Sequence, residues 1–268
     1  MVKDISDEIG KLDYREMKFG ILCNFYGFPQ YLDQVLQNWQ NIDNCFFACA
    51  SCKFDQYQEI SYLKEDAETV NLLKNKYSNL FEYIYTDKLS NDSIVRNYPL
   101  KYLLSKNVDY IWLLDGDEFY TKFEIENIIN FVKLQEFITV FKINFKNFFN
   151  DDKHWLDGFC PPRIFKVKIN NLKLDRFYFE NDVFYKDQNQ NDIDYKTLSC
   201  LEVPRTIAHV KHYSWCGDKD FLKNKVKYQN LRYNGICSYK WNDQTNSLEL
   251  NEDFYSKYFV RKPEIYIE

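Results

Sequence analysis

The stretch Asp109–Glu118, DYIWLLDGDE, decides how this chain folds. Its first half is nearly all apolar, as in a β-strand that is covered on both faces, and it runs directly into Asp115, Asp117 and Glu118. These three carboxylates repel one another unless a cation or an apolar pocket relieves them. In open α/β sheets, ligands bind where the strands end. The stretch therefore predicts a ligand site with a divalent metal at the carboxyl end of a buried strand, with a solvated acidic turn as the alternative.

Strand-like and helix-like patterns alternate on both sides of this stretch. Short apolar runs of β type predict strands at 19–26, 45–52, 81–86, 109–114 and 138–145. Apolar residues at helical spacing, or polar segments with a capping residue, predict helices at 31–39, 61–76, 93–105 and 122–134. The alternation predicts an α/β fold with a mixed, mainly parallel sheet that is flanked by helices.

The alternation of strand-like and helix-like patterns ends after about residue 149. Residues 150–218 contain turn signals, short β-type runs and all three histidines, so we expect an irregular region there. A last helix is expected at 220–231. With 268 residues and no internal repeat, the chain is expected to form one domain over 1–268.

Composition excludes several classes of protein. An apolar content of 45%, with 23 Phe, 22 Tyr and 5 Trp, excludes a disordered chain. A net charge of −5 argues against nucleic acid and anionic membranes as partners. The longest apolar run, Cys45–Ala50, is too short for a transmembrane segment. Because the charged segment 1–18 lacks a signal-peptide core, we expect a cytoplasmic protein whose eight cysteines are thiols.

Three segments resemble the GT-A glycosyltransferases, enzymes with a Rossmann-like fold that use nucleotide sugars and carry a D-x-D metal motif. Leu113–Phe119, LLDGDEF, is similar to the D-x-D-E-F motif of their family-two-like branch. Ser93–Asn97, SIVRN, matches the Arg or Asn on the preceding helix. His212–Trp215, HYSW, followed by Asp220–Lys223, DFLK, matches a late His-Tyr and a Lys-bearing helix. The resemblance implies a nucleotide-sugar-binding half over 18–149 and an acceptor-side half over 150–268.

The resemblance also implies a metal site. Asp117 would be a metal ligand, Asp115 would contact the metal or the donor ribose, and His212 would be a further ligand. A dication neutralises the charge of a departing diphosphate, and imidazole with carboxylate suits Mn²⁺ better than Mg²⁺. Residues three apart in a strand point to opposite faces, so we expect His212 but not His209 to bind the metal. A structural role is the alternative for each histidine.

Five further residues are expected on the donor side. Arg96 could hold the base, ribose or phosphate of the nucleotide, with an exposed helix arginine as the alternative. Lys223 is our choice for a phosphate contact among the lysines of the last helix, which could also form a solvated face. Position in the fold places Asn24 and Tyr26 around the base, and Asp55 as an acceptor from it.

The residue that would deprotonate the acceptor hydroxyl is Asp157 in our interpretation. An inverting enzyme needs a carboxylate near the acceptor, and Asp151 and Asp152 are the other candidates after the fifth strand. Trp155 could stack on a sugar, and Gly158 leaves room beside it. The Glu-Asp pair that the family usually has at this stage is absent, and a turn aspartate is the alternative.

The sequence thus predicts a metal-dependent glycosyltransferase. It would move a sugar from a nucleotide diphosphate, with a uridine diphosphate sugar favoured, to a hydroxyl of a glycan or glycoconjugate, with inversion. One alternative is a phosphohydrolase of the haloacid dehalogenase type, which also places Asp-x-Asp after an apolar strand. The other is a carbohydrate-binding protein without turnover. The Gly-rich, Lys-bearing start of sugar nucleotidyltransferases is missing, because 19–29 offers a single glycine.

Overall fold

A computed structural model describes residues 16–25, 29–51, 67–86, 92–178, 183–232, 235, 237–258 and 264–268. Two residues with an expected role, Tyr26 and Asp55, lie outside these ranges, as do the end of the strand expected at 45–52 and the first part of the helix expected at 61–76.

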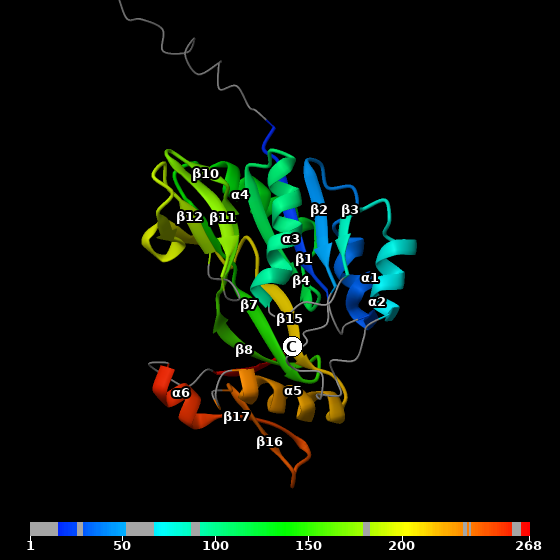
Figure 1. Cartoon of the computed structure of the whole chain (residues 1–268). Coiled ribbons are helices and arrows are strands. Elements are labelled where there is room, and N and C mark those ends of the chain that lie inside the picture. The colour runs from blue at the N-terminus through cyan, green and yellow to red at the C-terminus, as the bar shows by residue number, and fades with distance from the viewer. Residues whose placement is uncertain are drawn as a thin grey trace, which may run out of the picture.

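A seven-stranded mixed sheet forms the centre of the molecule (Figure 1). Its order is β14-β6-β9-β4-β1-β2-β3, and β4, β1, β2 and β3 run parallel while β9 is antiparallel to both of its neighbours. The strands are β1 (Phe19–Asn24), β2 (Cys45–Ala50), β3 (Phe81–Tyr85), β4 (Tyr110–Asp115), β6 (Val140–Lys142), β9 (Pro162–Lys166) and β14 (Cys200–Glu202). The mixed, mainly parallel α/β fold expected from the sequence is confirmed.

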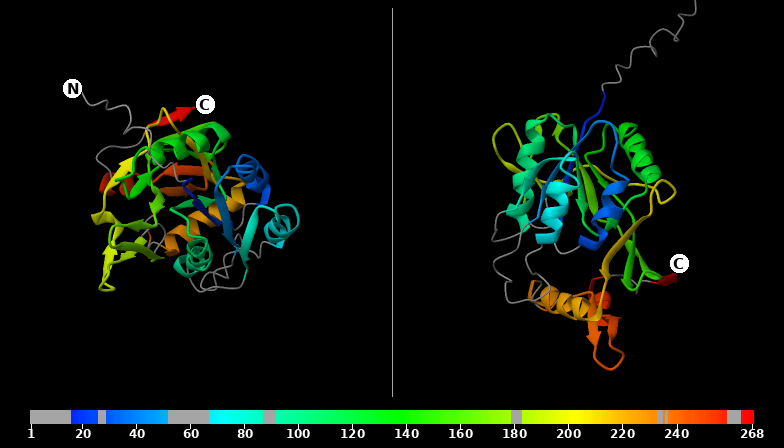
Figure 2. Two further views of the ribbon diagram at one scale, coloured as in Figure 1. Left: turned by 90° about the horizontal axis from the view of Figure 1, so that it is seen from above. Right: turned by 90° about the vertical axis from the view of Figure 1, so that its right-hand side faces the viewer.

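Both faces of this sheet are covered, which explains the apolar strands. One face packs against α1 (Pro29–Gln37), α2 (Ala67–Asn75) and α4 (Lys122–Lys133), with Trp112 and Leu114 of β4 in that core. The other face packs against α3 (Asp92–Ser105) and a small sheet, with Ile111 and Leu113 in that core. Successive residues of β4 therefore enter opposite cores, as the two-residue period of a strand requires. Figure 2 shows the helices on both sides of the central sheet.

The small sheet on the α3 face has the order β10-β11-β12-β13 and is antiparallel. Its strands are β10 (Lys168–Ile169), β11 (Leu172–Phe177), β12 (Val183–Lys186) and β13 (Asp192–Asp194), and a short 3₁₀ helix, η5 (Tyr195–Thr197), follows. Asn97 of α3 fastens it to the helix, because its Nδ2 donates to the Phe177 carbonyl oxygen (2.9 Å) and its Oδ1 accepts from the Phe177 N–H (2.8 Å).

A second sheet, β18-β8-β7-β15-β5, extends from the carboxyl end of the central sheet. Its strands are β5 (Glu118–Phe119), β7 (Phe145–Asn150), β8 (His154–Phe159), β15 (Val210–Cys216) and β18 (Ile265–Ile267). The single strand expected at 138–145 is therefore two strands in different sheets. The bend between them is held by Asn144, whose Nδ2 donates to the Val203 carbonyl oxygen (3.0 Å) and to Glu202 Oε1 (2.9 Å). Residues 150–218 are more regular than expected, because most of them lie in strands.

The C-terminal elements form a third core beyond this second sheet. The helix α5 (Lys219–Arg232), the hairpin of β16 (Tyr239–Asn242) and β17 (Ser247–Leu250), and the helix α6 (Glu252–Tyr258) gather at the far end of the molecule from β10 and β11 (Figure 1). Phe149 and Trp215 extend from β7 and β15 into this core. Among the described residues, no helix is long and apolar enough to cross a membrane.

Candidate functional site

The acidic stretch lies where the central sheet ends and the second sheet begins. Asp115 is the last residue of β4 and pairs in register with Asn24, the last residue of β1. Asp117 follows in a tight turn, and Glu118 starts β5. Gly116 packs against Phe25, since a Cβ on that glycine would lie 3.0 Å from Phe25 Cδ1. Asn24 therefore lies beside the acidic stretch at the carboxyl edge of the parallel strands.

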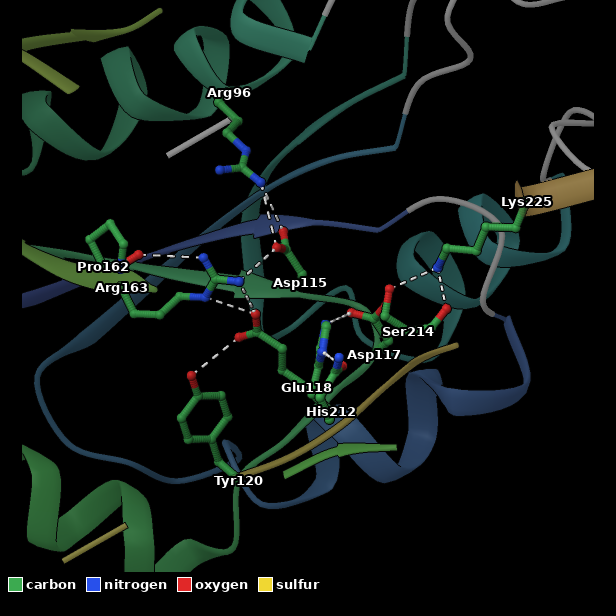
Figure 3. A network of polar contacts seen from close by, with 11 residues as sticks. Arg96, Asp115, Asp117, Glu118, Tyr120, Pro162, Arg163, His212, Ser214 and Lys225 are labelled. Atoms are coloured by element: carbon green, nitrogen blue, oxygen red, sulfur yellow. Dashed lines mark hydrogen bonds and ion pairs between the residues drawn. The ribbon is translucent and has the colours of Figure 1, made fainter. Parts of the chain in front are cut away.

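Two arginines approach Asp115 (Figure 3). Arg96 of α3 donates to Asp115 Oδ1 (3.2 Å), and Arg163 of β9 donates to Asp115 Oδ2 (3.3 Å). The Asp115 side chain keeps 24% of its surface exposed, whereas the side chain of Arg163 is 3% exposed. The carboxylate therefore has an inner face, bound by a buried cation, and an outer face toward solvent.

Glu118 lies deeper, behind the same arginine. Arg163 Nε donates to Glu118 Oε1 (2.8 Å), and the Tyr120 hydroxyl donates to Glu118 Oε2 (3.2 Å). Burial raises the pKa of Glu118 to about 7, and the charge of Arg163 opposes that rise. Burial likewise works to lower the pKa of Arg163, but Glu118 and Asp115 together raise it. Arg163 thus joins two of the three carboxylates of the motif.

Asp117 points away from this arginine and toward His212 of β15. Asp117 Oδ1 lies 3.5 Å from His212 Nε2, and the side chains are 8% and 11% exposed. His212 Nδ1 lies 2.7 Å from Asn147 Oδ1 of the neighbouring strand β7. Because an amide oxygen only accepts, Nδ1 carries the proton of the imidazole and Nε2 is the nitrogen turned to the carboxylate.

A buried lysine stands on the other side of Asp117. Lys225 of α5 is 6% exposed and donates from Nζ to the hydroxyl (2.8 Å) and the carbonyl oxygen of Ser214. Burial lowers the pKa of Lys225 to about 8, and the charge of Asp117 opposes this. Burial also works to raise the pKa of Asp117, but the charge and hydrogen bond of His212, the charge of Lys225 and a hydrogen bond from Ser214 hold it well below its usual value.

The donor set at Asp117 and His212 fits a divalent cation. Two atoms that each bind one ion at about 2.0–2.2 Å can lie up to about 4 Å apart, and Oδ1 and Nε2 are 3.5 Å apart. A histidine that donates its second N–H to an oxygen, as His212 does to Asn147, is the usual arrangement of a metal ligand. In the part of the chain that the structure describes, no three His, Cys, Asp or Glu side chains group as a complete metal site. A cation held here would thus take its remaining ligands from water or from a phosphate.

Arg96 and His212 meet the acidic stretch as expected, but two other expected residues do not. Lys223 Nζ pairs with Asp243 Oδ1 of the hairpin turn (2.6 Å), and the lysine beside the acidic stretch is Lys225. Asp157 pairs with Arg205 and lies 3.7 Å from His209 Nε2. The side chains of Lys223 and Asp157 therefore face partners other than the acidic stretch.

Asp157 and His212 lie on opposite faces of the second sheet. His212 is paired with Asn147, and Asn147 with Leu156, so these three side chains share a face. Asp157 follows Leu156 and points to the other face, toward His209. This placement, with the ion pair to Arg205, argues against the expected role of Asp157 as the base.

The ring of Trp155, which was expected to stack on a sugar, already packs against side chains of the protein. Tyr266 of β18 stacks on its ring, with centroids 4.6 Å apart and an interplanar angle of 20°. Lys146 Nζ lies 5.1 Å from the centroid of the same ring. His209 makes an edge contact at 5.3 Å, so it lies on the face opposite His212 as the spacing predicted.

Sequence reasoning missed Arg163, Asn147 and Ser214. Arg163 had one usable signal, since it is a charged residue directly before the apolar Ile164 and Phe165 in the short strand PRIFK. Asn147 and Ser214 had none, because their roles depend on pairings between strands that are distant in the sequence.

The comparisons with known proteins find similarity only among solved structures. No protein-family model matches the chain, and no curated protein matches it. TarS 1–349 of S. aureus in complex with UDP-GlcNAc has a TM-score of 0.44 and 13% identity over 86% of this chain and 69% of that one. TarS 1–349 in complex with UDP has a TM-score of 0.36 and 17% identity over 49% of this chain and 36% of that one.

A cytidylyltransferase from Leptospira borgpetersenii is also similar, with a TM-score of 0.33 and 16% identity over 56% of this chain and 60% of that one. The chain therefore spans between about a third and two thirds of the length of these proteins. At these identities and TM-scores the similarity says nothing about substrate or reaction, which must be argued from the site itself.

Proposed function

We propose that this protein is a metal-dependent glycosyltransferase. It would transfer a sugar from a nucleotide diphosphate donor, with a uridine diphosphate sugar favoured, to a hydroxyl of a glycan or glycoconjugate. The D-x-D-E-F motif at 115–119 suggests the substrate class by its resemblance to GT-A enzymes. The position of that motif at the carboxyl edge of four parallel strands supports a ligand site there.

One observation carries the proposal, and it is the pair of Asp117 and His212. A nearly buried carboxylate faces an imidazole nitrogen at 3.5 Å, and Asn147 fixes the tautomer of that imidazole. A carboxylate in a nearly dry site needs positive charge beside it, and a cation bound by Asp117 Oδ1 and His212 Nε2 would supply that charge. Asp117 and His212 would hold Mn²⁺ in preference to Mg²⁺, because imidazole is a ligand that Mg²⁺ rarely takes. When bound, such a cation neutralises the charge that develops on a departing diphosphate.

The residues around Asp115 fit the donor side of this proposal. Asp115 presents an exposed face beside Asn24 and is flanked by the guanidinium of Arg96. A carboxylate can accept from ribose hydroxyls, and a guanidinium can pair with a phosphate or carbonyl of the nucleotide. We assign Asn24, Arg96 and Asp115 to donor binding, and Asp117 and His212 to the metal.

Inversion, which the resemblance suggests, needs a carboxylate near the acceptor. Asp157 lies on the wrong face of the second sheet for this role. Of the other two candidates, Asp151 accepts from the backbone N–H groups of Lys153 and His154, whereas Asp152 lies exposed in the turn between β7 and β8. We therefore favour Asp152 over Asp157 as the carboxylate to test on the acceptor side.

The test is a thermal-shift screen of nucleotide sugars with and without Mn²⁺. A ligand at a hundredfold excess over its Kd adds about 2.7 kcal/mol to stability, which is readily measured as a rise in Tm. We expect a rise with a uridine diphosphate sugar plus Mn²⁺, and we expect Asp117→Ala to abolish its metal-dependent part. Asp253→Ala, which removes an exposed carboxylate from α6, is the matched control and should respond like the native protein.

Product analysis separates the alternatives. A transferase slowly releases the nucleotide from its donor when Mn²⁺ is present, a phosphohydrolase frees phosphate from monoesters, and a binding protein does neither. A full response of Asp117→Ala to donor plus Mn²⁺ would contradict the assignment of Asp117. Release of phosphate from monoesters without any response to nucleotide sugars would contradict the proposed class.

A further inference from the structure

We propose that Arg163 is a positioning residue. It binds the inner, buried side of Asp115 and so orients that carboxylate for the donor. The proposal rests on the function proposed above and adds a residue that no motif identifies. Arg163 itself would not touch the substrate, because its side chain is 3% exposed and its guanidinium lies on the inner face of Asp115. It would act through the carboxylate.

The geometry of Arg163 is that of a bridge between two carboxylates. Nη2 lies 3.3 Å from Asp115 Oδ2 and 2.5 Å from Glu118 Oε1, and Nε donates to the same Glu118 oxygen at 2.8 Å. The guanidinium also lies 5.4 Å from the centroid of the Phe145 ring. Hydrogen bonds, charge and an aromatic contact thus hold this side chain in one place.

Only an arginine can make this bridge. Its planar fork presents several N–H groups at fixed angles, whereas a lysine offers one flexible ammonium. Glu118 is fully buried and accepts from Nε, the Pro162 carbonyl oxygen accepts from Nη1 at 3.4 Å, and Nη2 reaches Asp115 of β4. Arg163 therefore fixes which oxygen of Asp115 faces inward.

This division of oxygens has a consequence for the donor. Arg163 donates to Asp115 Oδ2 at 3.3 Å, whereas Arg96, which comes from the α3 side, donates to Oδ1 at 3.2 Å and to Oδ2 at 3.5 Å. A ligand that approaches Asp115 from solvent would meet an acceptor whose direction Arg163 has already fixed. Without Arg163, Asp115 would keep its charge and its contacts with Arg96 but would lose the shorter of the two hydrogen bonds to its second oxygen.

Removing Arg163 alone would also destabilise the fold, because it leaves Glu118 buried with no cation. A loss of donor binding in that variant would therefore not identify a positioning role. We therefore compare Arg163→Met with the pair Glu118→Gln/Arg163→Met. The pair removes one charge of each sign and keeps an oxygen for the Tyr120 hydroxyl. We expect Arg163→Met to lower Tm strongly and the pair to recover most of that loss. Arg176→Met, which breaks the exposed ion pair with Asp192 in the small sheet, is the matched control.

The decisive measurement is donor affinity together with Mn²⁺ affinity. We expect the pair to bind a uridine diphosphate sugar about tenfold or more weakly than the native protein, as for loss of a charged hydrogen bond. Binding of Mn²⁺ alone, followed by electron paramagnetic resonance, should not change, because Asp117 is turned toward His212 and not toward Arg163 (Figure 3). Arg163→Lys keeps the charge, and it should also weaken binding of the donor but not binding of Mn²⁺. A general loosening of the fold would instead weaken the binding of both the donor and Mn²⁺.

Asp115→Asn completes the test as a cycle. It should weaken donor binding strongly in the native protein and much less in the Glu118→Gln/Arg163→Met background, because Arg163 acts through Asp115. Equal losses in the two backgrounds, or native donor affinity in the pair or in Arg163→Lys, would overturn the positioning role. If the native protein binds no nucleotide sugar at all, the proposed function fails first, and that result is distinct from either of these.

Discussion

The amide of Asn147 decides which nitrogen of His212 is free to bind a cation. Its Oδ1 accepts from Nδ1 at 2.7 Å, so the proton stays on that nitrogen and Nε2 faces Asp117. Asn147→Ala removes this acceptor without touching either proposed ligand. We expect the affinity for Mn²⁺ to fall by about 10- to 100-fold, as for other partners of metal-binding histidines, measured by electron paramagnetic resonance.

Asn150→Gly is the control for this prediction. It removes an amide from the same strand, but that amide bonds the backbone of Leu248 in β17 and not a histidine. Glycine suits its backbone, since Asn150 has a φ of 64°. If both variants kept native affinity for Mn²⁺, Asn147 would have no role at the site.

At the scale of single residues, the sequence predicts those site residues that are neighbours along the chain. The acids at 115–118 follow a buried strand, so their place at the edge of the sheet could be predicted from one segment. Arg163 could not be predicted, because it reaches the acids through the pairing of β9 with β4. Lys223 and Lys225 show the limit within a helix. Residues two apart lie about 200° apart around the axis, so one lysine faces Asp243 and the other faces Ser214.

At the scale of elements, the expected βα alternation was correct because the middle strands β1 and β4 are buried on both faces. The pattern failed at 138–145, where one apolar run belongs to two sheets. Both halves of that run contain buried apolar residues, and the bend at Asn144 is stabilised by residues about 60 positions later. Local sequence contains no signal for such a bend. The same limit explains why 150–218 looked irregular, since its strands are short and pair with distant partners.

The attachment of α3 to the small sheet gives a prediction at this scale. Asn97 makes two hydrogen bonds to the backbone of Phe177, and Arg96 precedes it on the same helix. Asn97→Ala leaves both backbone groups without this partner in a partly buried place. We expect the free energy of unfolding to fall by about 1–3 kcal/mol, measured by urea denaturation at 25 °C.

Lys101→Ala is the matched control, because this residue is exposed on the same helix. An exposed substitution away from such contacts should change stability by less than about 0.5 kcal/mol. Equal effects of the two substitutions would mean that the contact with Phe177 contributes nothing measurable.

At the scale of the whole molecule, three separate cores support one site. Two cores cover the faces of the central sheet, and the third lies under α5 and the hairpin β16–β17. Asp115 comes from the first sheet, His212 from the second, and Lys225 from the helix over the third core. The geometry around Asp117 therefore depends on how firmly the third core is attached, and that attachment runs through Phe149 and Trp215.

Tyr239 is the residue that tests this dependence. Its side chain is fully buried, and its ring centroid lies 4.6 Å from that of Trp215 and 5.8 Å from that of Phe149. Tyr239→Ala should remove about 3–5 kcal/mol of packing, as for other large aromatic truncations. Because local unfolding follows contiguous packed units, hydrogen exchange should accelerate in α5, β16 and β17 and remain slow in β1 and β4. Tyr266→Ala, which truncates a ring on the partly exposed strand β18, should leave exchange in α5 unchanged. Equal acceleration in β1 and β4 of Tyr239→Ala would show instead that the three cores unfold as one unit, so that α5 could not loosen around Asp117 by itself.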